Sequence, residues 1–215
     1  MWSLNTIFPI KLALGEIKNL EIRENNAAYQ ELLNCAKGYA DRYQKLNIGQ
    51  IPGVEAAREL FHSIGLDPTK RRPSSEALLR RALKNKDMYS INPLVDLGNW
   101  CSLEFLLPIC VYDANKIKGD VNIRLGKEGE SYLGHNNREV NLSGRFTIAD
   151  ASGPFGSPMT DSVRTAVYEK TKQAILTIFA PGSYSTELLN KRMHVFLERA
   201  INFCNGEIIK QEILE

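Results

Sequence analysis

The order of the predicted elements in this 215-residue sequence favours an α+β fold. Apolar residues recur at helical spacing in the first half and again after Ser185. Short apolar runs joined by Gly- and Asn-rich turns occupy residues 109–148, as is typical of strands. These strands and helices do not alternate as they do in a parallel doubly wound sheet. We therefore expect a single domain of mixed sheets with packed helices, made of an N-terminal strand and helix region (1–70), a core (72–179) and a C-terminal helix (185–206).

The N-terminal region is predicted to begin with strands and to continue with two helices. Phe8 to Ile22 alternates loosely between apolar and polar residues, which predicts a strand pair that turns at Gly15. Ala27 to Leu46 and Val54 to Ile64 predict helices, and the turn Ile51-Pro52-Gly53 separates them.

A further helix is predicted from Pro73 to Leu83. Ser74 and Ser75 follow the proline, and Glu76 lies in the first turn, where the helix dipole favours an acid. The same dipole favours the basic residues that gather near the other end of this helix.

The second half predicts one apolar helix, a series of strands and a final helix. Val95 to Leu107 is mostly apolar and is ended by Pro108. Ser185 opens a helix whose apolar residues follow the 3.6-residue period, and Gly206 is its natural stop. The strands between these helices are predicted at 109–112, 121–125, 140–142, 146–148 and 174–179.

Composition places the chain among ordinary globular proteins, with 43% hydrophobic residues, 24% charged residues and a net charge of +2. The four cysteines are widely spaced and form no C-x-x-C pair, which argues against a zinc site and suits a reducing compartment. The sequence contains neither a signal-peptide pattern nor an apolar run of the ~20 residues that cross a membrane. We expect a cytoplasmic location, no membrane partner, no metal and no cofactor.

Two linked segments carry most of the chemical information. Asn92, Asp96 and Asn99 are spaced by four and three residues, which places their side chains near one face of a helix. Polar groups among apolar residues need partners, and Asp96 and Asp113 are expected to accept backbone N–H groups that fix loops. Together with the segment Pro108–Asp113, they predict a polar-lined pocket on the α/β framework.

Five segments between Arg72 and Lys172 resemble, in the same order, the B3/B4 domain of the phenylalanyl-tRNA synthetase β subunit. The segments are Asn92–Asn99, Pro108–Asp113, Lys116–Gly119, Val121–Glu130 and Phe146–Asp150. Arg72–Glu76 and the N-terminal region look closer still to the stand-alone B3/B4 proteins, which lack the rest of the synthetase.

The resemblance implies an editing pocket that hydrolyses the ester of tRNA mischarged with tyrosine. Such a second site hydrogen-bonds the hydroxyl that a synthetic pocket rejects only modestly. The residues that match the family's pocket segments, and are therefore expected around or beneath one cavity, are Asn92, Asp96, Asn99, Cys110, Tyr112, Asp113, Ala149 and Asp150.

The sequence departs from the family pattern at two positions that matter for catalysis. The family's His falls on Cys110, which is expected to be a small buried hydrophobe rather than a nucleophile. The family's acidic residue has no clear match between Phe155 and Val163, where Asp161 is the nearby acid. His135 lies in an inter-strand loop and is interpreted as a solvated turn residue. The catalytic residues therefore stay unassigned.

A basic cluster is the candidate RNA-binding surface. The alternative interpretation is that these basic residues form a solvated helix face. We expect phosphate contacts to the tRNA backbone. The residues concerned are Arg71, Arg72, Arg80, Arg81 and Lys84.

Two functional hypotheses follow. The first is a stand-alone module that binds tRNA or aminoacyl-tRNA, with hydrolysis of mischarged aminoacyl-tRNA in trans as its further expectation. The second is a non-catalytic module that binds a small amino-acid-like ligand or a protein partner. A complete tRNA ligase is not predicted, because the resemblance covers one accessory module.

Overall fold

A four-stranded antiparallel sheet lies at the centre of the computed structural model, which describes residues 1–135 and 137–215. Its strand order is β10 (Glu207–Leu214), β2 (Ile10–Lys18), β9 (Gln173–Pro181) and β3 (Ile109–Asp113). The sheet thus combines strands from both termini with strands from the middle of the sequence, and β3 is one of its edges. Within the described ranges the chain has five α-helices and ten strands, which confirms the α+β class.

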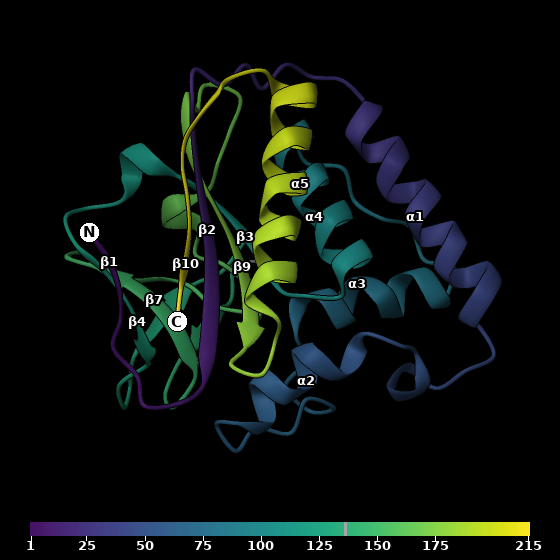
Figure 1. Ribbon diagram of the computed structural model, residues 1–215, viewed down its shortest axis with the longest axis horizontal. Coiled ribbons are helices and arrows are strands. Elements are labelled where there is room, and N and C mark those ends of the chain that lie inside the picture. The colour runs from purple at the N-terminus through teal and green to yellow at the C-terminus, as the bar shows by residue number, and fades with distance from the viewer. Residues whose placement is uncertain (136) are drawn as a thin grey trace.

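A second sheet packs on one face of the central sheet (Figure 1). Its strands, in order, are β1 (Trp2–Leu4), β4 (Val121–Leu125), β7 (Phe146–Asp150) and β8 (Gly153–Gly156). Only the β1–β4 pair is parallel among these strands. A separate pair consists of β5 (Ser131–Leu133) and β6 (Glu139–Asn141), and the single 3₁₀ turns are η1 (Ile48–Gln50), η2 (Ala114–Lys116) and η3 (Val163–Thr165).

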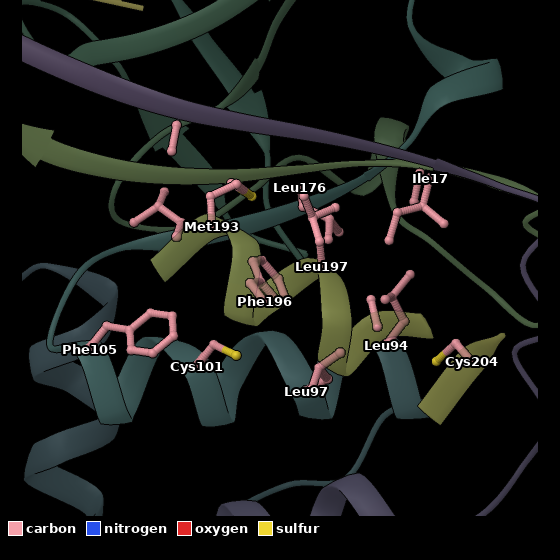
Figure 2. Packing of buried hydrophobic residues seen from close by; sticks show 14 of the residues in the cluster. Ile17, Leu94, Leu97, Cys101, Phe105, Leu176, Met193, Phe196, Leu197 and Cys204 are labelled. Atoms are coloured by element: carbon pink, nitrogen blue, oxygen red, sulfur yellow. The ribbon is translucent and has the colours of Figure 1, made fainter. Parts of the chain in front are cut away.

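Helices α4 (Pro93–Phe105) and α5 (Thr186–Cys204) cover the other face of the central sheet. Ala13 and Ile17 of β2 point toward these helices, whereas Leu12 and Leu14 point toward the second sheet. Figure 2 shows the α5 side chains Met193, Phe196 and Leu197 in the layer between the strands and α4. The central strands are therefore buried on both faces.

Helices α1 (Ala27–Tyr43) and α3 (Ser74–Leu83) pack beside α4, whereas α2 (Val54–His62) lies next to α3 and packs against β9 (Figure 1). Leu32 of α1, Leu79 of α3 and Leu103 of α4 share one buried cluster. None of the helices in the described ranges is long and apolar enough to cross a membrane.

The expected strand pair at Phe8–Ile22 is wrong. The segment holds one continuous strand, β2, and Gly15 lies in its middle. A Cβ atom at Gly15 would lie 2.7 Å from Leu197 Cδ2 and 2.9 Å from Met193 Sδ, so this glycine lets α5 approach the strand closely. The strands β1, β5, β8 and β10 were not expected, and β2 and β10 show that the sheet extends beyond residues 72–179.

The packing of α5 gives a stability prediction. Leu197→Ala removes a fully buried side chain from the layer between α5 and the central sheet, and we expect it to lower the free energy of unfolding by about 2–5 kcal/mol. Leu188→Ala is the matched control on the same helix, because Leu188 is 41% exposed and its loss is expected to cost well under about 1 kcal/mol. Urea unfolding measures both, and equal losses would contradict this packing.

Candidate functional site

A cavity of about 390 Å³ lies along the free edge of β3. Helices α3 and α4 form two of its walls, and the segment 157–167 that follows β8 forms another. Most of the lining is apolar, and the polar groups are few. The lining includes Ser74, Ala77, Leu78, Arg81, Asn99, Cys110, His135, Thr160 and Asp161.

The floor of this cavity is built on Tyr112 of β3. The Tyr112 side chain is fully buried, and its ring meets the edge of the Phe155 ring at a centroid distance of 4.9 Å. Gly156 makes room for it, because a Cβ atom there would lie 2.0 Å from the Tyr112 hydroxyl oxygen. The Tyr112 hydroxyl donates to Asp161 Oδ1 at 2.9 Å, so β3 fixes the carboxyl group at the cavity wall.

Asp161 is the most perturbed acid of the site. Burial penalises its charged form and raises the pKa of Asp161 to about 7, although hydrogen bonds from the Tyr112 hydroxyl and the Ser157 N–H act in the opposite direction. A carboxyl group with a pKa near neutrality changes its proton occupancy in the range in which general acids and bases work. Such a group in a cavity is a functional-site candidate.

Hydrogen bonds hold the segment that carries Asp161 in place. The Tyr132 hydroxyl donates to Ser157 Oγ at 2.9 Å and also contacts the Thr160 carbonyl oxygen. The Ser74 N–H, at the start of α3, donates to the Pro158 carbonyl oxygen at 3.0 Å. The wall therefore connects α3 directly to the Asp161 segment.

The structure brings three of the eight expected pocket residues to this cavity. Asn99 and Cys110 line it, and Tyr112 lies beneath it. The Cys110 thiol is buried and donates to the Ser157 carbonyl oxygen at 3.5 Å. Burial raises the pKa of this thiol well above its usual value, so Cys110 is protonated at neutral pH and unsuited to nucleophilic attack.

Asn92 and Asp96 shape the cavity without lining it. Asn92 caps α4, where its side chain accepts the Val95 N–H at 3.0 Å. The buried Asp96 carboxylate accepts the Ile91 N–H at 2.9 Å and the Ser90 hydroxyl at 2.6 Å. These bonds position Ile91, which lines the cavity.

The remaining three expected residues lie elsewhere. Asp113 accepts the Asn115 N–H and the Thr171 hydroxyl beyond the end of β3. Ala149 is buried in β7 of the second sheet. Asp150 is engaged by two nitrogens of Arg164 at 2.9 and 3.0 Å and by the Lys118 N–H at 2.7 Å. Asp113, Ala149 and Asp150 therefore do not line this cavity, and the two acids hold neighbouring loops instead.

The expected basic cluster divides between two places. Arg81 lines the cavity, hydrogen-bonds to the Asp87 carbonyl oxygen and lies 4.3 Å from the centre of the Tyr89 ring. Arg72, Arg80 and Lys84 line a second cavity instead. Arg71 is exposed and lines neither cavity.

Two lining residues were not assigned to the pocket from sequence. Asp161 was noted only as an acid near the family's position, because an isolated acid among Pro, Gly and Ser gives no periodic signal. His135 was interpreted as a solvated turn residue, and it does lie in an exposed turn. It also lines the cavity, where partial burial lowers its pKa. Within the described ranges, no group of three or more His, Cys, Asp or Glu side chains is arranged to hold a metal ion.

The sequence of this chain matches a known protein family. A family model described as the B3/4 domain matches residues 56–204, a range that includes every lining residue of the cavity. This chain belongs to the B3/4 domain family.

The proteins to which this chain is similar include much longer ones. The phenylalanine–tRNA ligase β subunit of Neisseria meningitidis serogroup B is 30% identical over 190 residues, which are 82% of this chain and 24% of that protein. The β subunit of Paramagnetospirillum magneticum is 42% identical over 65 residues, 30% of this chain and 8% of that one. The chain thus spans about a quarter or less of these relatives.

A solved structure supports the fold of the B3/4 domain. An N-terminal fragment of the phenylalanyl-tRNA synthetase β subunit from Pyrococcus horikoshii superimposes with a TM-score of 0.51 at 12% sequence identity. The alignment covers 100% of this chain and 54% of that one.

The raised pKa of Asp161 gives a prediction for the pH dependence of stability. An unfolded aspartate has a pKa of about 3.9. The folded state therefore keeps a proton between about pH 4 and 7 that the unfolded state releases, and stability falls as pH rises through this window. Asp161→Asn removes this loss, so its unfolding free energy relative to the parent should rise by about 1–4 kcal/mol from pH 4 to pH 8.

Denaturant unfolding at several pH values measures this difference. Asp120→Asn is the control, because the Asp120 side chain is 81% exposed and lies outside the cavity. A stability difference between Asp161→Asn and the parent that stays constant with pH would contradict the assignment.

Proposed function

We propose that this chain binds the aminoacyl end of tRNA in the Asp161 cavity and hydrolyses the ester of mischarged aminoacyl-tRNA in trans. The observation that carries the proposal is Asp161 itself, a carboxyl group fixed by Tyr112 at the wall of a mostly apolar cavity in a B3/4 domain. The named relatives are subunits of phenylalanine–tRNA ligase, which fits a tRNA-related substrate.

The cavity has the size and chemistry for an amino-acid side chain. Its volume of about 390 Å³ is within the usual range of small-ligand pockets. Apolar residues such as Val95 and Val167 suit the body of the side chain, and Asp161 offers a polar contact. A carboxylate accepts about four hydrogen bonds, and the Tyr112 hydroxyl and the Ser157 N–H leave capacity for about two more donors. A substrate hydroxyl or ammonium group would supply one of them, and a water molecule the other.

Hydrolysis needs a water molecule that attacks the ester carbonyl carbon and a proton for the departing ribose oxygen. The bond between the carbonyl carbon and the ribose oxygen breaks, and the products are the free amino acid and the tRNA with a free 3′ end. The buried Cys110 thiol is not the nucleophile. Asp161 has a pKa matched to accepting the water's proton near neutral pH, and Asn99 and Thr160 add polar groups to the same cavity.

A second candidate function is a non-catalytic module for an amino-acid-like ligand. The observation that favours it is Cys110, which replaces the family's His by a buried, protonated thiol. Binding by the cavity would survive this replacement, whereas a step that depends on imidazole would not.

A panel of aminoacyl-tRNAs tests the proposed hydrolysis. We expect the chain to deacylate at least one mischarged species, and we expect Asp161→Asn to lower kcat/KM by at least about 100-fold. If ionised Asp161 accepts the proton, the parent's kcat/KM should rise with pH and level off above about pH 7.

Asp120→Asn is again the control and should retain the parent rate. Binding without hydrolysis of any species would favour the non-catalytic alternative. Equal rates for Asp161→Asn and the parent would exclude Asp161 as the group that accepts the proton.

A further inference from the structure

A second cavity, of about 360 Å³, lies against a different face of α3. Ser74, Ala77, Leu78 and Arg81 face the Asp161 cavity, at the i, i+3, i+4, i+7 spacing of one helix side. Glu76, Arg80 and Leu83 face the second cavity, and Leu79 and Ala82 face the buried cluster shared with α1 and α4. Helix α3 is thus a common wall, and its width of about 10 Å separates the two cavities.

The second cavity carries a large excess of positive charge. Four cations line it, Arg58, Arg72, Arg80 and Lys84, together with one acid, Glu76, which leaves a surplus of three positive charges. The Glu76 carboxylate is already engaged, because it is 4% exposed and receives two hydrogen bonds from Arg58 at 2.7 and 2.9 Å. It pairs with Arg58 and, at 3.8 Å, with Arg72, and the ion pairs of the described residues include none between Glu76 and Arg80 or Lys84.

The walls of this cavity are fixed, and one donor in it is unsatisfied. A Cβ atom at Gly49 would lie 2.6 Å from Arg58 Nη1, so the η1 turn packs directly on Arg58. Arg72 Nε is buried and has no hydrogen-bond partner in the described part of the chain, although Glu76 Oε1 lies 3.8 Å away. The Arg72 side chain as a whole is 30% exposed and lines the cavity, so an anionic ligand there would contact its guanidinium group.

The geometry points to a binding site for a nucleotide unit of an RNA strand in this second cavity, with Arg72, Arg80 and Lys84 around its phosphate. The volume exceeds that of a bare phosphate, and Leu46, Ile48 and Leu83 offer apolar surface to a sugar or base. Because α3 separates the cavities by one helix width, one strand can reach both. This site rests on the proposed function: with the aminoacyl end in the Asp161 cavity, the adjoining nucleotides would cross α3 and place their phosphate in the second cavity.

Binding of labelled, uncharged tRNA to the full chain tests the site. Arg80→Gln/Lys84→Gln alters two exposed side chains and should leave the melting temperature unchanged. We expect about tenfold weaker binding at 0.1 M salt and a salt-dependence slope that is smaller by about 1.4, as for two lost phosphate contacts to a single strand. The control Lys170→Gln/Lys191→Gln removes the same charge from exposed residues outside both cavities and should bind like the parent.

Equal losses in both double variants would mean that net charge alone acts, and no loss in either would mean that the cavity is unused. Both outcomes overturn the inference. Competition at constant ionic strength defines the ligand: adenosine 5′-monophosphate should displace tRNA at a lower concentration than inorganic phosphate does. Displacement by polyglutamate as effective as that by the nucleotide would overturn the assignment to RNA in favour of an acidic protein partner.

A small substrate separates this inference from the proposed function. Arg80→Gln/Lys84→Gln should lower kcat/KM for full-length aminoacyl-tRNA about tenfold and leave hydrolysis of a 3′-aminoacyl-adenosine ester unchanged. If the parent hydrolyses neither substrate, the proposed function fails. The tRNA-binding experiment still tests whether the second cavity binds RNA. If the variant loses activity on the small ester as well, the cavity does not act through the RNA body.

Discussion

Burial of the central sheet on both faces is the constraint on which the rest of the structure depends. Alternate residues of β2, β9 and β3 pack against α4 and α5 on one side and against the second sheet on the other. In β3 this alternation turns Ile109 and Val111 toward the helices, and Cys110 and Tyr112 toward β8 and the segment behind it. The candidate site exists because β3 is an edge strand, so both sets of side chains meet the same cavity region.

The sheet fixes the floor of the site, and α3 fixes its relation to the basic surface. Three sides of this short helix have three different neighbours: the Asp161 cavity, the apolar core and the cationic cavity. The ion pair between Arg58 and Glu76 ties α3 to α2, and the Ser74 N–H ties it to the Asp161 segment. A buried ion pair contributes more to geometry than to net stability.

Sequence reasoning succeeds where a signal is local. The helices begin near Ala27, Ser74 and Ser185 as their patterns predict, because capping and periodicity are properties of neighbouring residues. Prediction from sequence fails where an element far away in the chain determines the local structure. A lone glycine in an apolar run suggests a turn, but Gly15 lies in an unbroken strand because α5 packs against it. Likewise β10 has exposed isoleucines and becomes a strand because β2 offers it an edge.

The same distinction explains the candidate site. Asn99 and Cys110 follow from the order of the segments, since α4 and β3 are consecutive and adjacent. Asp150 lies in an equally recognisable segment, but Arg164 and the Lys118 N–H occupy its carboxylate, so family likeness alone does not decide which acid faces the cavity. Asp161 does face it, because Tyr112 reaches across from β3 and Gly156 leaves room for the phenol. The polar chemistry of this B3/4 domain therefore rests on a contact between residues 49 positions apart, which no local pattern in the chain encodes.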